Sequence, residues 1–449
     1  MLRIRGLSGD LVTTVPVENI TDVRSLKQHL HQLHGCPPRF RQRLLLHGET
    51  LQDSAELVSQ AQADALAAAA DQGKLAEVES MLQLPQDPDL PDSYGLKPLG
   101  RAAFEGHLQT ARLLLQAGAA PGGTFAGVDG GTCLMMASRR GHIEMARLLL
   151  AAGAEKDLVD INGNTALMMA SEYGHVDVVH LLLDAGANVN VADPTGCSGH
   201  TALILAAMQP HVKVVRLLLE AGAAKNLADD NGCTALMAAS FKGHVEVVRL
   251  LLDVGARQDL ADDSGMTALK LAAAEGHAEV LRSLLEAGAG QDLVDSAFMT
   301  AFGRRHVEAF CLLLNAGANK DLADASGRTA LMLAASQCQL EFVRLLLEAG
   351  ADKNLADNNG CTALMMAWNV EALRLLLDAG ASKDLVDNKG NTALMAASCQ
   401  GIVEGVRLLL EAGANKDVAN DNGSTALSLA VAQGNSQVER VLREGVADK

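Results

Sequence analysis

The chain has 449 residues and a formal net charge of −17 at pH 7, which argues against non-specific nucleic-acid binding and against attraction to an anionic membrane surface. No apolar run approaches the roughly 18 residues that a membrane-spanning helix requires, so we expect no membrane insertion. Only 2% of the residues are aromatic, whereas Gly and Ala are abundant, and this composition predicts thin, closely packed layers rather than one deep globular core.

The first residues and the cysteines indicate the cellular compartment of the chain. The opening sequence MLRIRGLSGD has no apolar leader segment, so we expect no secretory signal. Eight cysteines are scattered without CxxC or Cys/His ligand spacing, which is typical of a reducing compartment. We therefore expect a cytoplasmic protein, with the nucleus as an open alternative, and we expect a monomer.

Residues 1–60 predict a small segment of strands and one helix. Polar and apolar residues alternate over residues 1–17 on both sides of a Ser-Gly-Asp turn, which predicts a β-hairpin. Residues 22–33 have the apolar spacing of a helix, and Gly35 with two nearby prolines ends it. Residues 41–53 then predict a strand, a turn and a second strand.

The same segment resembles ubiquitin up to about residue 58. The resemblance rests on the opening Met-x-x-Ile, Leu7-Ser8-Gly9, Lys27, Gly35-Cys36-Pro37-Pro38 and Gln42-Arg43-Leu44-Leu45. It implies a β-grasp fold, but the last long strand and the terminal Gly-Gly of that family are missing, so we expect no conjugation to substrates. The resemblance also implies a receptor-binding patch that would map to Leu7 and Leu45.

From about residue 62 the sequence repeats itself. The block LLLEAGA and its variants recur, and a Thr-Ala-Leu-Met phrase or a close variant precedes each block, often with Gly-His between them. The glycine of the block recurs at intervals of 29–36 residues, at Gly118, Gly153, Gly186, Gly222, Gly255, Gly288, Gly317, Gly350, Gly380, Gly413 and Gly445.

One unit illustrates the predicted elements. Residues 160–164 have turn chemistry, and Thr165 is a good N-cap for a short helix of small residues. Gly174 ends that helix, and residues 176–184 form a second helix with a single apolar stripe. Such a pair cannot bury its stripe alone, so neighbouring units must stack to make a continuous core.

The period near 33 residues and the phrases T-x-L-x-x-A, G-H and L-L-L-x-x-G-A resemble the ankyrin repeat over roughly residues 62–449. We therefore predict an all-α solenoid of about 12 stacked ankyrin helix–turn–helix repeats at 61–449. A small α+β ubiquitin-like (β-grasp) segment that lacks its last strand precedes the solenoid at 1–60. Within the array we expect a degenerate first repeat at 62–94, short repeats near 295–323 and 358–387, and a polar C-terminal cap at 421–449.

The repeats depart from the family pattern in two ways. The family has Thr-Pro-Leu-His, whereas here Ala usually replaces Pro and Met usually replaces His, so Met packing should replace the Thr–His hydrogen bond of the family. The short repeats at Ser296–Arg305 and Ala367–Asn369 have lost Gly-His and part of the first helix. We expect these two places to be weak points of the array.

No group of residues in the sequence predicts catalysis. His29 and His31 would point to opposite sides of a helix, so they and the nearby His34 and Cys36 do not make a convincing metal site. The Gly-rich residues 121–131 lack the GK[ST] of a phosphate loop. The repeated Gly-His pairs are spread along the array, which favours structural histidines, and Cys133, Cys233 and Cys361 occupy equivalent sites that favour packing. We expect no enzyme, no cofactor, no metal and no small-molecule substrate.

The ankyrin resemblance implies that partner proteins lie on the concave face, which the finger turns and the first helices form. The matching positions are the turn residues and the two residues before Gly-His, and rings and arginines there are typical of binding hot spots. Local packing between adjacent first helices is the alternative role for each residue. The candidate partner-binding residues are Tyr94, Phe104, Arg139, Arg140, Ile161, Tyr173, Phe241, Lys242, Met266 and Arg328.

These observations leave three functions open. The repeats favour a non-enzymatic protein–protein interaction scaffold or adaptor that binds partners along the concave face. The first alternative is a ubiquitin–proteasome pathway adaptor that docks through residues 1–60. In the second alternative, residues 1–60 only cap the end of the solenoid.

Overall fold

The computed structural model describes residues 2–5, 11–15, 45–46, 49–50, 54–83, 87–122, 130–192 and 199–444. This described part contains 24 helices, α2 to α25, which follow one another as 12 pairs. It divides into two compact units, Met1–Ala239 with Arg249–Ala256 and Ser240–Val248 with Arg257–Lys449. The helical repeats and their number agree with the prediction.

Two short strand pairs lie near the N-terminus. Strand β1 (Leu2–Arg5) pairs antiparallel with β2 (Leu11–Val15), and β3 (Leu45–Leu46) pairs antiparallel with β4 (Glu49–Thr50). Both predicted strand pairings are therefore confirmed. Residues 22–33 lie outside the described residues, as does the possible metal cluster at 29–36, and the ubiquitin-like fold stays a prediction. Helix α2 (Ser54–Asp71) runs across the predicted boundary at residue 60.

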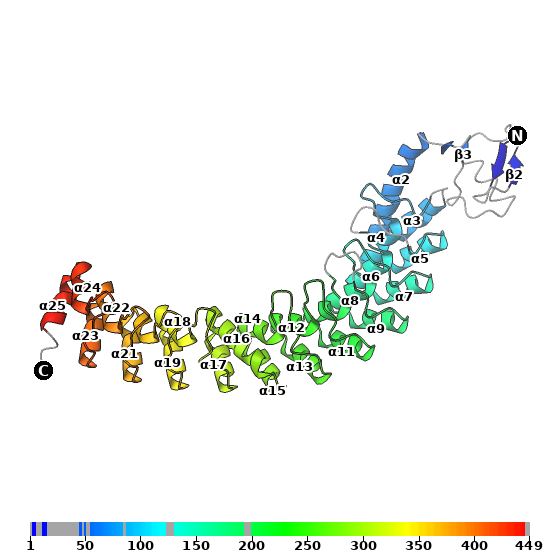
Figure 1. Cartoon of the computed structure of the whole chain (residues 1–449). Coiled ribbons are helices and arrows are strands. Elements are labelled where there is room, and N and C mark those ends of the chain that lie inside the picture. Colours follow the sequence, from blue (N-terminus) through cyan, green and yellow to red (C-terminus); the bar gives the residue numbers. More distant parts are fainter. Residues whose placement is uncertain are drawn as a thin grey trace. The chain divides into compact units, whose positions relative to one another are not determined.

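Unit 1 contains two rows of helices (Figure 1). The first helices of successive pairs contact one another from α2 to α10, and the second helices do so from α3 to α11. Their bounds are α3 (Leu75–Leu82), α4 (Pro98–Glu105), α5 (Leu108–Gln116), α6 (Cys133–Arg140), α7 (Ile143–Ala151), α8 (Ala166–Glu172), α9 (Val176–Asp184), α10 (Ala202–Ala207) and α11 (Val212–Glu220). Helices α12 (Ala235–Lys242) and α13 (Val245–Asp253) cross the border between the units.

Unit 2 also consists of alternating first and second helices. Its first helices are α14 (Ala268–Glu275), α16 (Gln291–Arg304), α18 (Ala330–Ser336), α20 (Ala363–Met366), α22 (Ala393–Gln400) and α24 (Ala426–Ala432). Its second helices are α15 (Ala278–Glu286), α17 (Val307–Asn315), α19 (Leu340–Glu348), α21 (Val370–Asp378), α23 (Val403–Glu411) and α25 (Ser436–Glu444).

A threonine cap begins most first helices. The Thr165 hydroxyl accepts a hydrogen bond from the Met168 backbone N–H at 3.2 Å, and the Met168 sulfur accepts one from the Thr165 N–H at 3.4 Å. The pair Thr132 and Met135 repeats this arrangement. Methionine therefore does more than pack, because its sulfur, a weak acceptor, completes a capping box.

The Gly-His pairs join one repeat to the next. Gly141 has φ 75°, and a Cβ on it would lie 2.5 Å from the Nδ1 of His175 in the following repeat. The Nε2–H of His175 donates to the Arg139 carbonyl at 3.0 Å. His107, His142, His211, His277 and His306 make the same bond to the end of the preceding first helix. These histidines are structural, as the sequence predicted.

The finger turns are closed by a geometry around an aspartate that recurs from repeat to repeat. The Asp160 carboxylate is buried and accepts the N–H groups of Asn162 and Asn164 at 2.9 and 2.7 Å. Adjacent fingers are also linked, because Asp157 accepts the N–H of Asn188 in the next finger at 2.8 Å. These bonds hold the exposed tips at a fixed spacing.

The first short repeat corrects one prediction. Its first helix, α16, is not shortened but has 14 residues, because helix replaces the missing finger turn. The glycine is lost, and Arg305 adopts its φ of 63°, but the histidine is retained as His306. Phe298 and Phe310 stack at 4.6 Å, and Phe342 of α19 lies edge-on to Phe310 at 4.8 Å. Buried rings therefore fill this repeat.

The second short repeat follows the prediction. Helix α20 has only four residues, and Asn369 replaces the lost Gly-His by capping α21 through the N–H groups of Glu371 and Ala372. The Thr362 hydroxyl is buried and has no hydrogen-bond partner in the described part of the chain.

Candidate protein-binding surface

The ends of three first helices in unit 1 surround a hollow of about 390 Å³. It is lined by Phe104 at the end of α4, by Arg139 and Arg140 at the end of α6, and by Tyr173 and His175 after α8. We call it the Arg/Tyr hollow. The structure thus brings together four of the ten candidate residues, which come from three consecutive repeats.

Each arginine lies over a ring from a neighbouring repeat. The guanidinium carbon of Arg140 lies 4.2 Å from the centre of the Phe104 ring, and that of Arg139 lies 5.4 Å from the centre of the Tyr173 ring. The Tyr173 ring is 43% exposed and lies parallel to His175 at 6.4 Å. The two arginines also end α6, where cations interact favourably with the helix dipole.

The backbone explains why these side chains face outward together. Gly141 ends α6 in the left-handed conformation, so the chain turns away just after both arginines, which remain exposed. The bond from His175 to the Arg139 carbonyl then places the end of α8 beside the end of α6. The alternative role of local packing is therefore also realised, since each ring contacts a neighbouring repeat.

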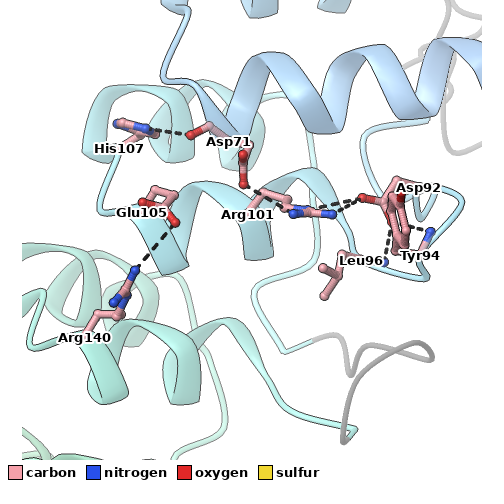
Figure 2. A network of polar contacts seen from close by, with 8 residues as sticks. All are labelled: Asp71, Asp92, Tyr94, Leu96, Arg101, Glu105, His107 and Arg140. Atoms are coloured by element: carbon pink, nitrogen blue, oxygen red, sulfur yellow. Dashed lines mark hydrogen bonds and ion pairs between the residues drawn. The ribbon is translucent and has the colours of Figure 1, made fainter.

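A second polar network, around Arg101, joins helices α2 and α4 to the finger turn at residues 92–96 (Figure 2). Arg101 forms an ion pair with Asp92 at 2.8 Å and a longer one with Asp71 at 3.5 Å. Asp92 accepts the N–H groups of Tyr94 and Leu96, each at 2.9 Å. The guanidinium carbon of Arg101 lies 5.9 Å from the centre of the Tyr94 ring, which is 72% exposed. Tyr94 is not among the residues that line the hollow.

The remaining candidates do not join this cluster. Ile161 is 63% exposed at a finger tip, and Met266 is half-buried in a later finger turn. Arg328 forms an ion pair at 2.9 Å with Asp324 of its own turn. Phe241 is 42% exposed in unit 2, with the Lys242 ammonium 5.2 Å from its ring centre. Of the predicted ubiquitin-like patch, Leu45 lies in β3, and Leu7 lies outside the described residues.

Sequence reasoning missed one exposed ring. Trp368, the only tryptophan of the chain, is 61% exposed just after the four-residue helix α20. The signal was present, because a lone tryptophan stands in a repeat that has lost part of its first helix. This repeat lacks Gly-His, the marker that defines the matching positions in the other repeats.

Three of the described thiols lie in surroundings that disfavour the thiolate form. Burial raises the pKa of the Cys133 thiol to about 12, and burial also raises the pKa of Cys311 and Cys361. Cys133 is not equivalent to Cys233 and Cys361, since it follows its cap threonine whereas they precede theirs. In the described ranges no group of three or more His, Cys, Asp or Glu side chains could hold a metal ion, and no helix there is long and apolar enough to cross a membrane.

The comparisons with known proteins agree with the repeat architecture. Models described as ankyrin repeats match residues 66–115, 122–193, 203–297, 297–387 and 368–449. The chain belongs to the ankyrin repeat family. A search of curated proteins found no match. Among solved structures, the human ASB11 ankyrin repeat domain is 29% identical, and the match covers 50% of this chain and 98% of that chain with a TM-score of 0.45.

Membership in this family supports a general protein-interaction scaffold. Ankyrin repeats are typically non-enzymatic interaction modules, and the matching models describe repeats rather than a catalytic domain. The partner itself has to be inferred from the surface.

Proposed function

We propose that this ankyrin repeat protein is an adaptor that binds a partner protein through the Arg/Tyr hollow and the first-helix ends beside it. One observation carries the proposal: a chain with 2% aromatic residues places two rings and two arginines around one exposed hollow. Tyr and Arg are enriched at the hot spots of interfaces, and rings held by neighbouring repeats lose little entropy on binding.

Capture from cell extract by the full-length chain tests the proposal. The test variant carries Phe104→Ala with Tyr173→Ala, and the matched control carries Leu75→Ala with Val254→Ala, which are exposed apolar residues elsewhere. Proteins that the wild type and the control capture should be lost with the test variant, while the circular dichroism of all three stays the same. Identical sets of captured proteins would contradict the proposal.

A second candidate function is docking to a ubiquitin receptor through residues 1–60. The two antiparallel strand pairs, β1–β2 and β3–β4, support it because they occupy the places where the ubiquitin resemblance expects hairpins. Leu45→Ala in the full chain should then abolish binding to purified ubiquitin receptors. Binding unchanged by this substitution would leave residues 1–60 as a cap of the array.

A further inference from the structure

The two arginines of the Arg/Tyr hollow are held by rings, and only Arg140 is paired with a carboxylate of the described residues. Arg139 makes no ion pair and no side-chain hydrogen bond with any described residue. Its guanidinium group instead lies over the Tyr173 ring in a cation–π contact. Arg140 has one ion pair, with Glu105 at 3.8 Å, between two well-exposed side chains. An exposed pair at this distance contributes little energy and is easily exchanged.

The residues that line the hollow include no carboxylate. The formal charge of the whole chain is −17, so a hollow lined by two guanidinium groups is a local exception to its acidity. The rings fix both guanidinium groups from one side, and a guanidinium lying over a ring still has N–H donors to offer to another partner. Such a site is preorganised for an anion that sits beside apolar surface.

We propose, resting on the adaptor function proposed above, that the hollow binds a glutamate or aspartate side chain within an acidic segment of the partner polypeptide. The carboxylate accepts hydrogen bonds from Arg139 and displaces Glu105 from Arg140. An apolar side chain next to it in the partner packs against the Phe104 and Tyr173 rings. Arginine and carboxylate form paired, charge-assisted hydrogen bonds that are about twice as strong as those between neutral groups, and their planar shapes match.

The contact with Glu105 favours a carboxylate over other anions. The ionic group that the described residues place against these guanidinium groups is the Glu105 carboxylate, so the geometry accommodates a carboxylate. A nucleic acid brings a dense row of negative charges, which an acidic chain repels over its whole length. A volume of about 390 Å³ is at the small end for binding sites and suits one or two side chains of a peptide.

Peptide selection tests this proposal directly. A random library of 12-residue peptides displayed on phage is panned against the full chain, against Arg139→Gln with Arg140→Gln, and against Arg147→Gln with Arg216→Gln. The last variant is the matched control, because it removes the same charge from the second helices α7 and α11. The wild type and the control should enrich peptides with Glu or Asp beside an apolar residue, and the test variant should not.

Fluorescence anisotropy with one enriched peptide then measures the contact. Replacing its acidic residue by Gln or Asn, or using the Arg139/Arg140 variant, should weaken binding about 10- to 100-fold, whereas the control variant should bind like the wild type. A version with phosphoserine at the same place should not bind better than the carboxylate.

Three results would overturn the carboxylate assignment. They are enriched peptides without acidic residues, the same acidic peptides on the test variant, and tighter binding of the phosphoserine version. Failure of the adaptor function itself is distinguishable, because capture by the wild type would then be unchanged by the Phe104 and Tyr173 substitutions. Loss of capture with those substitutions, together with failure of the acidic peptides, would leave an interface that recognises apolar groups alone.

Discussion

Phe310→Ala should destabilise the repeat that has lost its finger turn by about 4–5 kcal/mol. Phe310 is fully buried, and truncation of a core phenylalanine typically costs about 3–5 kcal/mol. The upper end applies because the ring contacts three others, Phe298 at 4.6 Å, Phe342 at 4.8 Å and Phe302 at 6.2 Å. Each such pair contributes about 0.5–1.5 kcal/mol beyond the area buried.

Urea unfolding of the full chain measures this loss. Trp368 is the only tryptophan, and helix α20 before it contacts α18, so its fluorescence reports on unit 2. With a slope of about 2–3 kcal/mol/M, the midpoint of that signal should fall by roughly 1.5–2.5 M. Phe241→Ala is the matched control, because that ring is 42% exposed, and its midpoint should change little.

The outcome decides whether the short repeat is a weak point or a strong one. If Phe310→Ala shifts the fluorescence midpoint no more than Phe241→Ala does, the four rings do not act as a core and the reasoning fails. In an array whose stability is a sum of neighbouring contacts, a large shift would mean that aromatic packing compensates for the missing turn.

Three further predictions concern other parts of the array. In hydrogen exchange, the amides of α20 should exchange faster than those of α17, because α20 has four residues and the hydroxyl of its threonine cap is unbonded; equal protection would contradict this. His175→Ala should lower the free energy of unfolding, measured with a chemical denaturant, by about 1–2 kcal/mol. His175→Asn should lower it less, because Asn435 in the last repeat already makes the equivalent bonds to carbonyls at 2.9 and 3.1 Å. Equal losses for the two variants would refute the carbonyl bond. Burial raises the pKa of Cys133 from 9.0 to about 12, so the thiol should stabilise the fold fully below pH 9 and lose this contribution as pH rises toward 12. The free energies of unfolding of the wild type and of Cys133→Ala should therefore converge over that range. Parallel curves would be inconsistent with a buried thiol.

The sequence period predicted most of the array because each repeat has the same local chemistry. A cap threonine, a small-residue helix, a glycine with positive φ and an apolar stripe appear at matching offsets, and each is determined within a few residues. The partner of each Gly-His histidine was not predictable in this way. In the bonds of His107, His142, His175 and His277 the acceptor is a carbonyl at the end of the preceding first helix, 36–38 residues earlier, and only stacking brings the two together.

The short repeat at 291–315 shows where local rules fail. A deletion of four residues in a helix–turn–helix unit can shorten the helix or remove the turn, and the period alone does not distinguish these. The structure removes the turn, since α16 continues through it for 14 residues. Phe298 and Phe302 then lie one helical turn apart and face Phe310 and Phe342, and these buried rings are a physical reason to keep the helix.

The Arg/Tyr hollow was predictable from the sequence in part. Phe104 and Arg139 stand two residues before the glycine that follows their helix, and Arg140 and Tyr173 stand one residue before it, so the sequence could predict that these side chains follow one another along the first-helix face. It could not predict that Arg140 would both lie over the Phe104 ring and pair with Glu105. Nor could it predict that Arg139 would turn to the Tyr173 ring rather than to the acidic neighbours Glu105 and Glu172. That choice leaves Arg139 without a carboxylate, and it is the reason to look for one in the partner.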